Sequence, residues 1–403
     1  MVLSQASRLK SVRYDIRGPV LRRARQLEAE GHRVLKLNLG NPAPWGLETP
    51  EAVVHGLVHN IGDAQGYSDA RGIYSARLAV AQYYQGRGVE SVGPDDVLLG
   101  NGVSELIVMS LQALLETGDE VLVPSPDYPL WTGAVNLCGG RAVHYRCDEQ
   151  AGWAPDLEDA ASRITPNTRA LVIINPNNPT GAVYSRETLL GLLALARRYG
   201  LLVLADEVYD GVLYDGAVHE HAAAHAPDLL VLTMCGLSKN HRAAGFRSAW
   251  MAVTGPKHEA GEYIEGLELL ANMRLCPNVP AQHAIQGALG NRPTITSLLQ
   301  PGGRLHEQRD RTWSQLNPIP GVNCVKPAGA FYLFPRLDPD AHKIHDDQQL
   351  VIDLLDQQLL LLSHGTGFNL PTTDHLRLVF LAPADVLDDA VDRLDRFLAT
   401  YHQ

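Results

Sequence analysis

Polar side chains stand close behind three short apolar stretches that are typical of buried strands. Asn178 follows "ALVII", Asp206 and Tyr209 follow "LLVLA", and Ser238 and Lys239 follow "LLVLTMC". In open parallel sheets, ligands bind beyond the carboxyl ends of the strands, so these residues are the first candidates for a site. A charge in such a place is costly unless it is paired, and Asp206 and Lys239 therefore need partners.

The combination of Lys239 and Asp206 suits an aromatic aldehyde cofactor. A lysine amine can form a Schiff base with pyridoxal 5'-phosphate. An aspartate can keep the pyridinium nitrogen protonated, so that the ring accepts electrons from a substrate carbanion. For either residue alone, a structural ion pair is the competing interpretation. Together they predict a pyridoxal phosphate site in which both residues are catalytic.

The phosphate of such a cofactor needs binding residues of its own. The stretch "GNGVSELI" places Gly102, Val103 and Ser104 before an expected helix. Free backbone N–H groups and the helix dipole favour an anion there. Arg247 and Ser238 can add charge-assisted hydrogen bonds from the segment of the lysine. Taken alone, the glycine-containing turn also fits an ordinary strand-to-helix connection.

The elements that must position these residues alternate along the chain. Between about residues 50 and 290, helical stretches alternate with apolar runs such as "RALVIINP" and "LLVLADE". This alternation predicts helices that cover a mostly parallel sheet. Between these two runs, Ser185 can cap a helix that ends at Gly200. Further on, "VNCVKPAGAFYLFPRL" predicts two strands around a glycine-containing turn.

The expected architecture is an α/β protein with two domains. The large domain, residues 46–294, carries the mostly parallel sheet covered by helices. The smaller α+β domain combines residues 1–45 and 295–403, so that both termini contribute to it. A chain of 403 residues, 45% of them hydrophobic, is long enough to bury a core in each domain.

The net charge of the chain excludes some classes of partner. It is −11 at pH 7, whereas nucleic acids and anionic membranes attract a concentrated positive field. Small soluble molecules are therefore the expected partners, with no nucleic acid and no membrane. No apolar run approaches the roughly 20 residues of a membrane span and the start has no apolar signal core, so the expected location is the cytoplasm. The five cysteines form no CxxC pair, which fits reduced thiols rather than disulfides or a zinc ribbon.

Several motifs occur in a characteristic order. The stretches "NPNNPTG", "ADEVYD", "SK" and "GFR" resemble the fold-type-I aminotransferases that use pyridoxal phosphate. The stretches "YDIRGP", "LNLGNPAPWG", "GNGVSELI", "PSPDYPLW" and "RLCPNVPAQHAIQ" extend the resemblance to the bacterial alanine (glutamate–pyruvate) aminotransferases over nearly the whole chain. The resemblance implies ping-pong exchange of the amino group between L-alanine and 2-oxoglutarate, giving pyruvate and L-glutamate.

The resemblance also implies roles for the residues that match its motifs. Lys239 would form the Schiff base and then move the substrate proton, while Asp206 would pair with the pyridinium nitrogen. Tyr209 and Asn178 would bond the phenolic oxygen of the ring, and Asn178 would also lie at the substrate. Tyr128, in "PSPDYPLW", would stack on the ring, although core packing is the simpler interpretation without the resemblance.

Other matching residues concern the substrate and a neighbouring subunit. Arg377, in "DHLRLVF", would hold the substrate α-carboxylate with its planar fork, and Gly40 would lie beside that carboxylate. A surface arginine on a small-domain strand is the alternative for Arg377. Tyr67, in "QGYSDARG", matches the tyrosine that reaches the phosphate of the neighbouring subunit, which implies a homodimer with a shared active site. A glutamate substrate needs a second cation, for which Arg17 is the candidate alongside Tyr14; a structural N-terminal arginine is the alternative.

Some residues depart from the family pattern or stand outside it. Asn240 and His241 stand where the resembled enzymes usually have Thr-Tyr, which affects the expected substrate range and rate. His241 is either a new acid–base group or a hydrogen-bonded histidine behind the site. The histidines of "HEHAAAH", residues 219–225, have metal-like spacing, but no fitting carboxylate or cysteine cluster accompanies them. A solvated surface loop or helix is expected there.

Other functions remain open on the same residues. An aminotransferase of another small or branched amino acid, or a carbon–sulfur lyase, would use the same lysine and aspartate. A pyridoxal phosphate sensor joined to a DNA-binding domain is disfavoured, because no room is expected for that domain before residue 14. A dinucleotide-dependent dehydrogenase is disfavoured because no GxGxxG follows a strand. No metal is expected in the site.

Overall fold

The computed structural model describes residues 3–12, 18–291 and 293–403. Its largest sheet contains β2 (Val97–Gly100), β3 (Glu120–Ser125), β4 (Arg141–Asp148), β5 (Ala154–Pro155), β6 (Thr168–Ile174), β7 (Leu202–Asp206), β8 (Val231–Gly236) and β9 (Ala249–Thr254). Their order across the sheet is β2-β9-β8-β7-β6-β3-β4-β5. The neighbours from β4 to β8 pair in parallel, whereas β9 is antiparallel to β8 and β2, and β5 is antiparallel to β4. The prediction of a mostly parallel sheet is confirmed.

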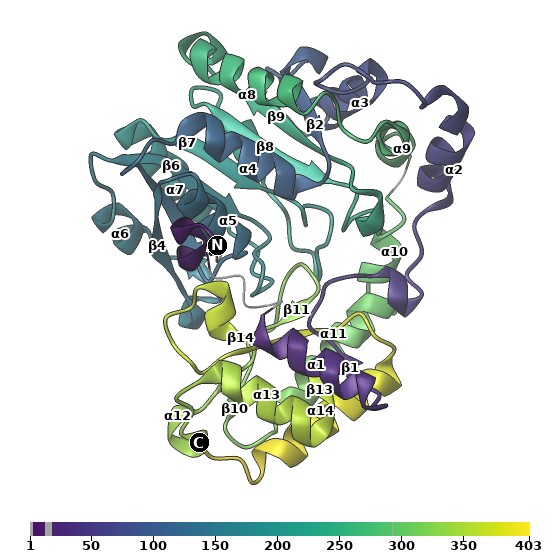
Figure 1. The fold of residues 1–403 in the computed structure, drawn as a ribbon, viewed down its shortest axis with the longest axis vertical. Coiled ribbons are helices and arrows are strands. Elements are labelled where there is room, and N and C mark those ends of the chain that lie inside the picture. Colours follow the sequence, from purple (N-terminus) through teal and green to yellow (C-terminus); the bar gives the residue numbers. More distant parts are fainter. Residues whose placement is uncertain (1–2, 13–17, 292) are drawn as a thin grey trace.

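Helices cover both faces of this sheet because the side chains of the inner strands alternate between two cores (Figure 1). Leu171 and Val203 belong to one hydrophobic cluster, while Val172 and Leu204 belong to the other. The first face is covered by α3 (Tyr74–Gln85), α6 (Leu157–Ser162) and α7 (Arg186–Tyr199), while α9 (Val279–Leu289) packs against α3 and α2 (Glu51–His59) packs against α9. The second is covered by α4 (Val103–Leu114), α5 (Leu130–Leu137) and α8 (Gly261–Met273).

Helix α7 illustrates how local sequence sets these elements. The Ser185 side chain accepts a hydrogen bond of 3.1 Å from the backbone N–H of Thr188, which caps the helix. Gly200 follows the last turn with a φ of +65°, a conformation that favours glycine. The predicted crossover helix between β6 and β7 is confirmed, and it lets those two strands run in parallel.

A third hydrophobic cluster joins the N-terminal segment to the last hundred residues of the chain. Strand β1 (Leu35–Lys36) pairs in parallel with β13 (Leu360–Leu361), and β15 (Leu376–Val379) lies between β11 (Tyr332–Leu333) and β14 (Ser363–His364). The helices here are α1 (Pro19–Ala29), α10 (Thr296–Leu299), α11 (Arg304–Leu316), α12 (Pro339–His342), α13 (Asp347–Gln358) and α14 (Ala384–Leu398). Domain boundaries at residues 46 and 294 stay a prediction.

The prediction of two strands around one glycine-containing turn is wrong in its pairing. Strand β10 (Val322–Asn323) pairs with β12 (Arg336–Leu337), whereas β11 pairs with β15. The intervening segment is held by the other part of the molecule, because the backbone N–H of Gly329 bonds the carbonyl of Gly181 at 2.8 Å. That contact prevents a simple hairpin.

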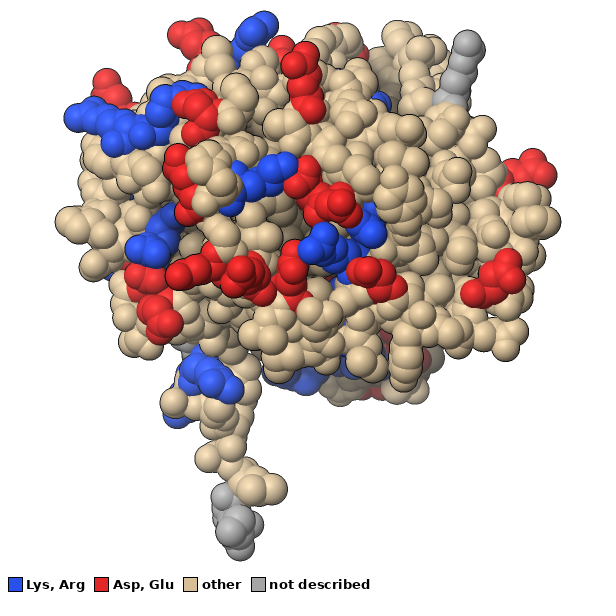
Figure 2. Space-filling model, turned by 90° about the horizontal axis from the view of Figure 1, so that it is seen from above, with Lys and Arg blue, Asp and Glu red and all other residues tan. Residues whose placement is uncertain are grey.

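The surface and the cysteines agree with the composition. Lys and Arg side chains lie among Asp and Glu side chains over the face seen in Figure 2. None of the described helices is both long and apolar enough to cross a membrane. All five cysteines carry free thiols.

Candidate active site

The loop after β8 brings Lys239 to a backbone segment from the start of the chain. Nζ of Lys239 donates a hydrogen bond of 2.6 Å to the carbonyl oxygen of Gly40. It also lies 5.8 Å from the ring centroid of Tyr209. Burial lowers the pKa of Lys239, so a larger share of its amine is unprotonated at neutral pH. The unprotonated amine is the form that attacks an aldehyde.

The carboxylate of Asp206 lies at the end of β7 and is buried. Its Oδ2 accepts a hydrogen bond of 3.0 Å from the indole N–H of Trp131, and its Oδ1 accepts one of 3.4 Å from the backbone N–H of Val208. Asp206 makes no ion pair with any residue that the structure describes. Burial raises the pKa of Asp206 to about 6. A buried carboxylate without an ion pair fits a cationic ring nitrogen such as that of pyridoxal phosphate.

Arg377 lies within β15 and is only 3% exposed, which contradicts the alternative of a surface arginine. Its Nη1 donates a hydrogen bond of 2.9 Å to Oδ1 of Asn178, and its Nη2 donates to the carbonyl oxygen of Asn38. The guanidinium carbon lies 4.5 Å and 4.4 Å from the ring centroids of Tyr332 and Phe368. These contacts hold the planar fork in place and bring it next to Asn178.

Tyr332 connects the lysine and the arginine, and the sequence analysis missed it. Its hydroxyl is hydrogen-bonded to that of Tyr209. A Cβ at Gly40 would lie 2.6 Å from the Tyr332 hydroxyl oxygen, so glycine is needed for this close approach. The stretch "GAFYLF" did not mark Tyr332 as a site residue, because a tyrosine within an apolar strand normally indicates core packing.

The predicted phosphate site brings together two segments. Gly102, with a φ of +90°, precedes α4, whose first two residues are Val103 and Ser104. Arg247 reaches this helix end, because its Nη2 donates to the carbonyl oxygen of Asn101 at 3.4 Å. A Cβ at Gly102 would lie 2.0 Å from that Nη2. The helix N-terminus and the guanidinium therefore share one concave place that suits an anion.

Gly102→Ala is expected to weaken pyridoxal phosphate binding by about 10- to 100-fold, since each charge-assisted hydrogen bond contributes about 1.5–3 kcal/mol. The added methyl group displaces the guanidinium of Arg247. Gly118→Ala is the matched control, because Gly118 has a similar φ of +96° but no atom within 4 Å of an added Cβ. Equilibrium dialysis of both variants measures the effect. Equal losses in both would show that backbone strain alone is responsible.

For the remaining predicted residues, the structure gives their burial and their neighbours. Ser238 is half-buried, two residues beyond β8. Tyr128 is half-buried and packs against the cluster that covers the second face of the sheet, so its stacking on the cofactor stays a prediction. Tyr67 is 82% exposed. Tyr14 and Arg17 lie outside the described residues.

Comparison with protein families identifies the family of this chain. The model of the family "Aminotransferase class I and II" matches residues 32–394. This chain belongs to the class I and II aminotransferases. The family membership that the motifs suggested is thereby confirmed.

Individual relatives cover this aminotransferase from end to end. It is 56% identical to the glutamate-pyruvate aminotransferase AlaA of Escherichia coli K12, over 100% of this chain and 99% of that protein. It is 59% identical to the alanine aminotransferase of Mycobacterium tuberculosis H37Rv, over 99% of this chain and 94% of that protein. The crystal structure of an aminotransferase from Escherichia coli superposes with a TM-score of 0.99 at 55% identity, covering all of both chains. The alanine aminotransferase from Pyrococcus furiosus gives a TM-score of 0.92 at 36% identity, covering 98% of this chain and 100% of that one.

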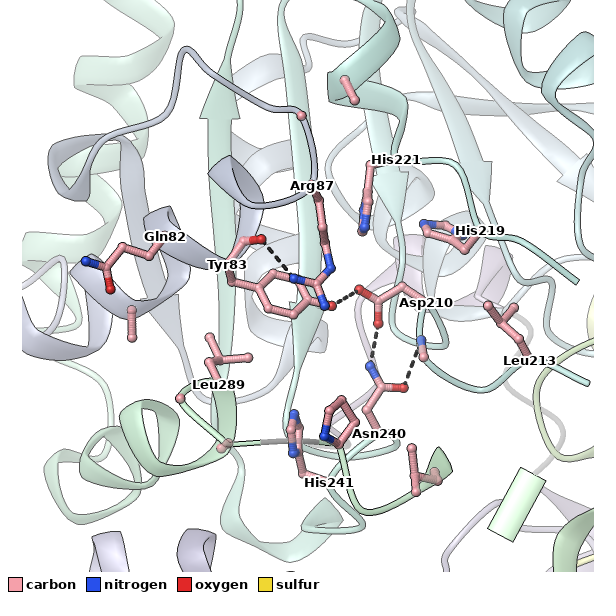
Figure 3. Close-up of a pocket in the computed structure, with 18 of the residues that line it drawn as sticks. Gln82, Tyr83, Arg87, Asp210, Leu213, His219, His221, Asn240, His241 and Leu289 are labelled. Atoms are coloured by element: carbon pink, nitrogen blue, oxygen red, sulfur yellow. Dashed lines mark hydrogen bonds between the residues drawn. The ribbon is translucent and has the colours of Figure 1, made fainter. Parts of the chain in front are cut away.

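Two residues that depart from the usual aminotransferase motif face a cavity of about 1080 Å³ (Figure 3). Asn240 holds Asp210, since its Nδ2 donates to Oδ1 of Asp210, and its own Oδ1 accepts from the backbone N–H of Gly211 at 3.3 Å. Burial lowers the pKa of His241 to about 4, so its ring is neutral at pH 7. Of the two alternatives for His241, the structure therefore favours a neutral histidine that packs behind the site. It disfavours an acid–base group that exchanges protons near neutral pH.

The expectation of a solvated loop at residues 219–225 is wrong. The side chains of His219 and His221 are 3% and 9% exposed, and both lie against the buried carboxylate of Glu207. Glu207 belongs to the stretch "ADEVYD", which precedes the histidines and was read only for Asp206 and Tyr209. His225 pairs with Glu220 instead, at 2.7 Å.

Proposed function

We propose that this aminotransferase exchanges the amino group between L-alanine and 2-oxoglutarate, with bound pyridoxal phosphate and ping-pong kinetics. One observation carries the proposal. Nζ of Lys239 and Nη2 of Arg377 converge on the carbonyl oxygens of Gly40 and Asn38, so an amine and a carboxylate-binding fork face the same short backbone segment. An α-amino acid carries its carboxylate next to its reacting carbon. Arg377 could therefore bind the carboxylate while Lys239 reaches the α-carbon. The printed names of the most similar relatives support the choice of alanine and glutamate.

Different residues around the site would bind different parts of the cofactor. When bound, pyridoxal phosphate supplies a ring that accepts the electron pair left on the substrate α-carbon. Asp206 would hold the ring nitrogen, with Trp131 fixing the direction of its carboxylate. Tyr209 and Asn178 would bond the ring oxygen. The residues for the phosphate would be Gly102, Val103, Ser104, Ser238 and Arg247, with Tyr128 against the ring.

The residues that act on the substrate have distinct tasks. Arg377 would bind the α-carboxylate with two parallel hydrogen bonds, because its planar guanidinium is already positioned by contacts with the rings of Tyr332 and Phe368. Lys239, whose lowered pKa favours the neutral amine, would take the proton from the substrate α-carbon onto Nζ. Gly40 leaves room for the carboxylate beside Tyr332.

The substrate proposal is tested by following the absorption band of the bound cofactor. Rapid loss of the band is expected with L-alanine and L-glutamate, with L-valine and L-aspartate as comparisons. Pyruvate or 2-oxoglutarate should restore it. If L-alanine leaves the band unchanged while another amino acid bleaches it, the proposed substrate is wrong. If the purified protein mixed with pyridoxal phosphate has no such band, the cofactor assignment is wrong as well.

Arg17→Ala should lower kcat/KM for L-glutamate and 2-oxoglutarate by about 10- to 100-fold, because a hydrogen bond to a charged carboxylate contributes about 1.5–3 kcal/mol. L-Alanine and pyruvate should be affected far less, since they have no second carboxylate. Arg22→Ala, at an exposed position of α1, is the control. Equal losses for both substrate pairs would remove the role proposed for Arg17.

We also propose a cytoplasmic homodimer in which Tyr67 contacts the cofactor phosphate of the other subunit. The exposed side chain of Tyr67 is available for such a contact. Sedimentation at about twice the chain mass of 43.9 kDa is expected. A monomer that retains full activity would contradict the shared site.

A further inference from the structure

A second cluster of polar side chains surrounds Glu207, the residue that follows Asp206 in the sequence. Oε2 of Glu207 lies 2.5 Å from Nδ1 of His221 and 3.3 Å from Nε2 of His219. The two histidine rings have centroids 4.7 Å apart, and Figure 3 shows both at the wall of the cavity. The three ligand atoms lie within 4.8 Å of one another. Two imidazoles and a carboxylate converge in a buried place.

The ring of His219 is buried with few polar contacts. Its side chain is 3% exposed, and Nε2 has one charged neighbour among the described residues, Oε2 of Glu207 at 3.3 Å. Nδ1 has no hydrogen-bond partner there. A ligand that accepts the lone pair of Nε2 would bind beside this carboxylate oxygen.

We propose that Glu207, His219 and His221 bind one zinc ion, or a divalent transition metal of similar chemistry, separately from the pyridoxal phosphate site. Zinc prefers imidazole and carboxylate ligands at about 2.0–2.2 Å, and ligand atoms around a tetrahedral ion then lie about 3.3 Å apart. The separation of Glu207 and His219 already has this value. The contact between Glu207 and His221 must open by a little under 1 Å, which a small side-chain rotation provides.

Binding of the ion requires that any proton between Nδ1 of His221 and Oε2 of Glu207 leaves, because both atoms then donate lone pairs to the ion. The proton passes to solvent, and the site gains one positive charge overall. The ion gives up waters as it gains two nitrogens and one oxygen. His219 and His221 also line the cavity, from which a water molecule can supply a fourth ligand.

The bound ion would tie the segment around residues 219–221 to the end of β7. Backbone N–H of Ala222 already donates a hydrogen bond of 3.0 Å to Oε1 of Glu207, which leaves Oε2 for the ion. Because the folded state alone presents all three ligands together, zinc should raise the melting temperature, with a rise that grows as the logarithm of free zinc once its concentration exceeds Kd. This stabilisation does not depend on turnover.

The experiment uses the holoenzyme, freed of metal by a chelator and dialysed against Zn²⁺. One equivalent of zinc per chain is expected for the wild type, with an increase in melting temperature. His219→Gln should lose at least about 10-fold in zinc affinity, since one ligand is removed. His306→Ala is the matched control. His306 belongs to the other three-residue cluster, with Asp215 and Asp310, where Arg309 and Lys326 already neutralise the carboxylates.

A second measurement on the wild type does not depend on variants that fold. X-ray absorption of the zinc-loaded protein should show nitrogen and oxygen ligands and no sulfur. Sulfur ligands would assign the metal to cysteines and overturn the proposal. Zinc binding that is equal in the wild type and His219→Gln, or that disappears in His306→Ala, would overturn it too. Failure of cofactor binding or of transamination leaves this result unaffected, because the readout is bound metal.

Discussion

Lys239→Ala should lower the turnover of L-alanine with 2-oxoglutarate by about 10⁴-fold or more, since general base catalysis alone contributes about 10²- to 10⁴-fold. The variant loses both the amine that binds the cofactor aldehyde and the base that moves the substrate proton. The fold should persist, because the protein contact that disappears is one hydrogen bond to Gly40, which contributes about 0.5–1.5 kcal/mol. Steady-state and single-turnover kinetics measure the loss.

Two controls separate catalysis from structure in this experiment. Lys257→Ala removes a surface amine that lies 2.6 Å from Asp96, and it should retain full turnover. Added methylamine should restore part of the activity of Lys239→Ala, because a small amine can enter the space left by the side chain and take the proton. Near-normal turnover of Lys239→Ala without added amine would contradict the proposed mechanism.

The sheet and the edge that carries the site could be predicted from local patterns. The inner strands are buried on both faces, so they are continuous apolar runs that the sequence displays directly. Parallel strands end at the same edge, and this rule placed Asn178, Asp206 and Lys239 near one another before any contact was known. The glycine and helix start at residues 102–104 followed from a different local pattern, a glycine-containing turn before an expected helix.

Contacts between distant segments could not be predicted in this way. Trp131 bonds Asp206 across 75 residues, and Arg377 bonds Asn178 across 199 residues. The pairing of two-residue strands such as β10 and β11 depends on those distant contacts rather than on alternation. The histidine cluster was misread over a shorter span, since its carboxylate, Glu207, lies outside the stretch "HEHAAAH" and meets the histidines only when the chain turns back after β7.

Asp206→Ala should retain some cofactor and lose about 10²- to 10³-fold or more in turnover, the usual effect of removing a group that stabilises transition-state charge. The phosphate residues, such as Gly102 and Arg247, belong to other segments and should still bind. Without the carboxylate, the ring nitrogen loses its proton and the ring withdraws electrons less strongly. Asp228→Asn, at an exposed carboxylate paired with Arg197, is the control and should change little.

Asp206→Asn tests whether the charge itself is needed. The amide has nearly the same volume and its oxygen can still accept the hydrogen bond from Trp131, but its NH2 group cannot accept the 3.4 Å bond from Val208. The variant therefore loses the negative charge and one long hydrogen bond. The pH dependence gives an independent check. Because burial raises the pKa of Asp206 to about 6, its carboxylate gains a proton as the pH falls through 6, and the cofactor affinity of the wild type should fall with it. Asp206→Asn should lack this fall; if it keeps both the fall and normal turnover, another group must hold the ring nitrogen.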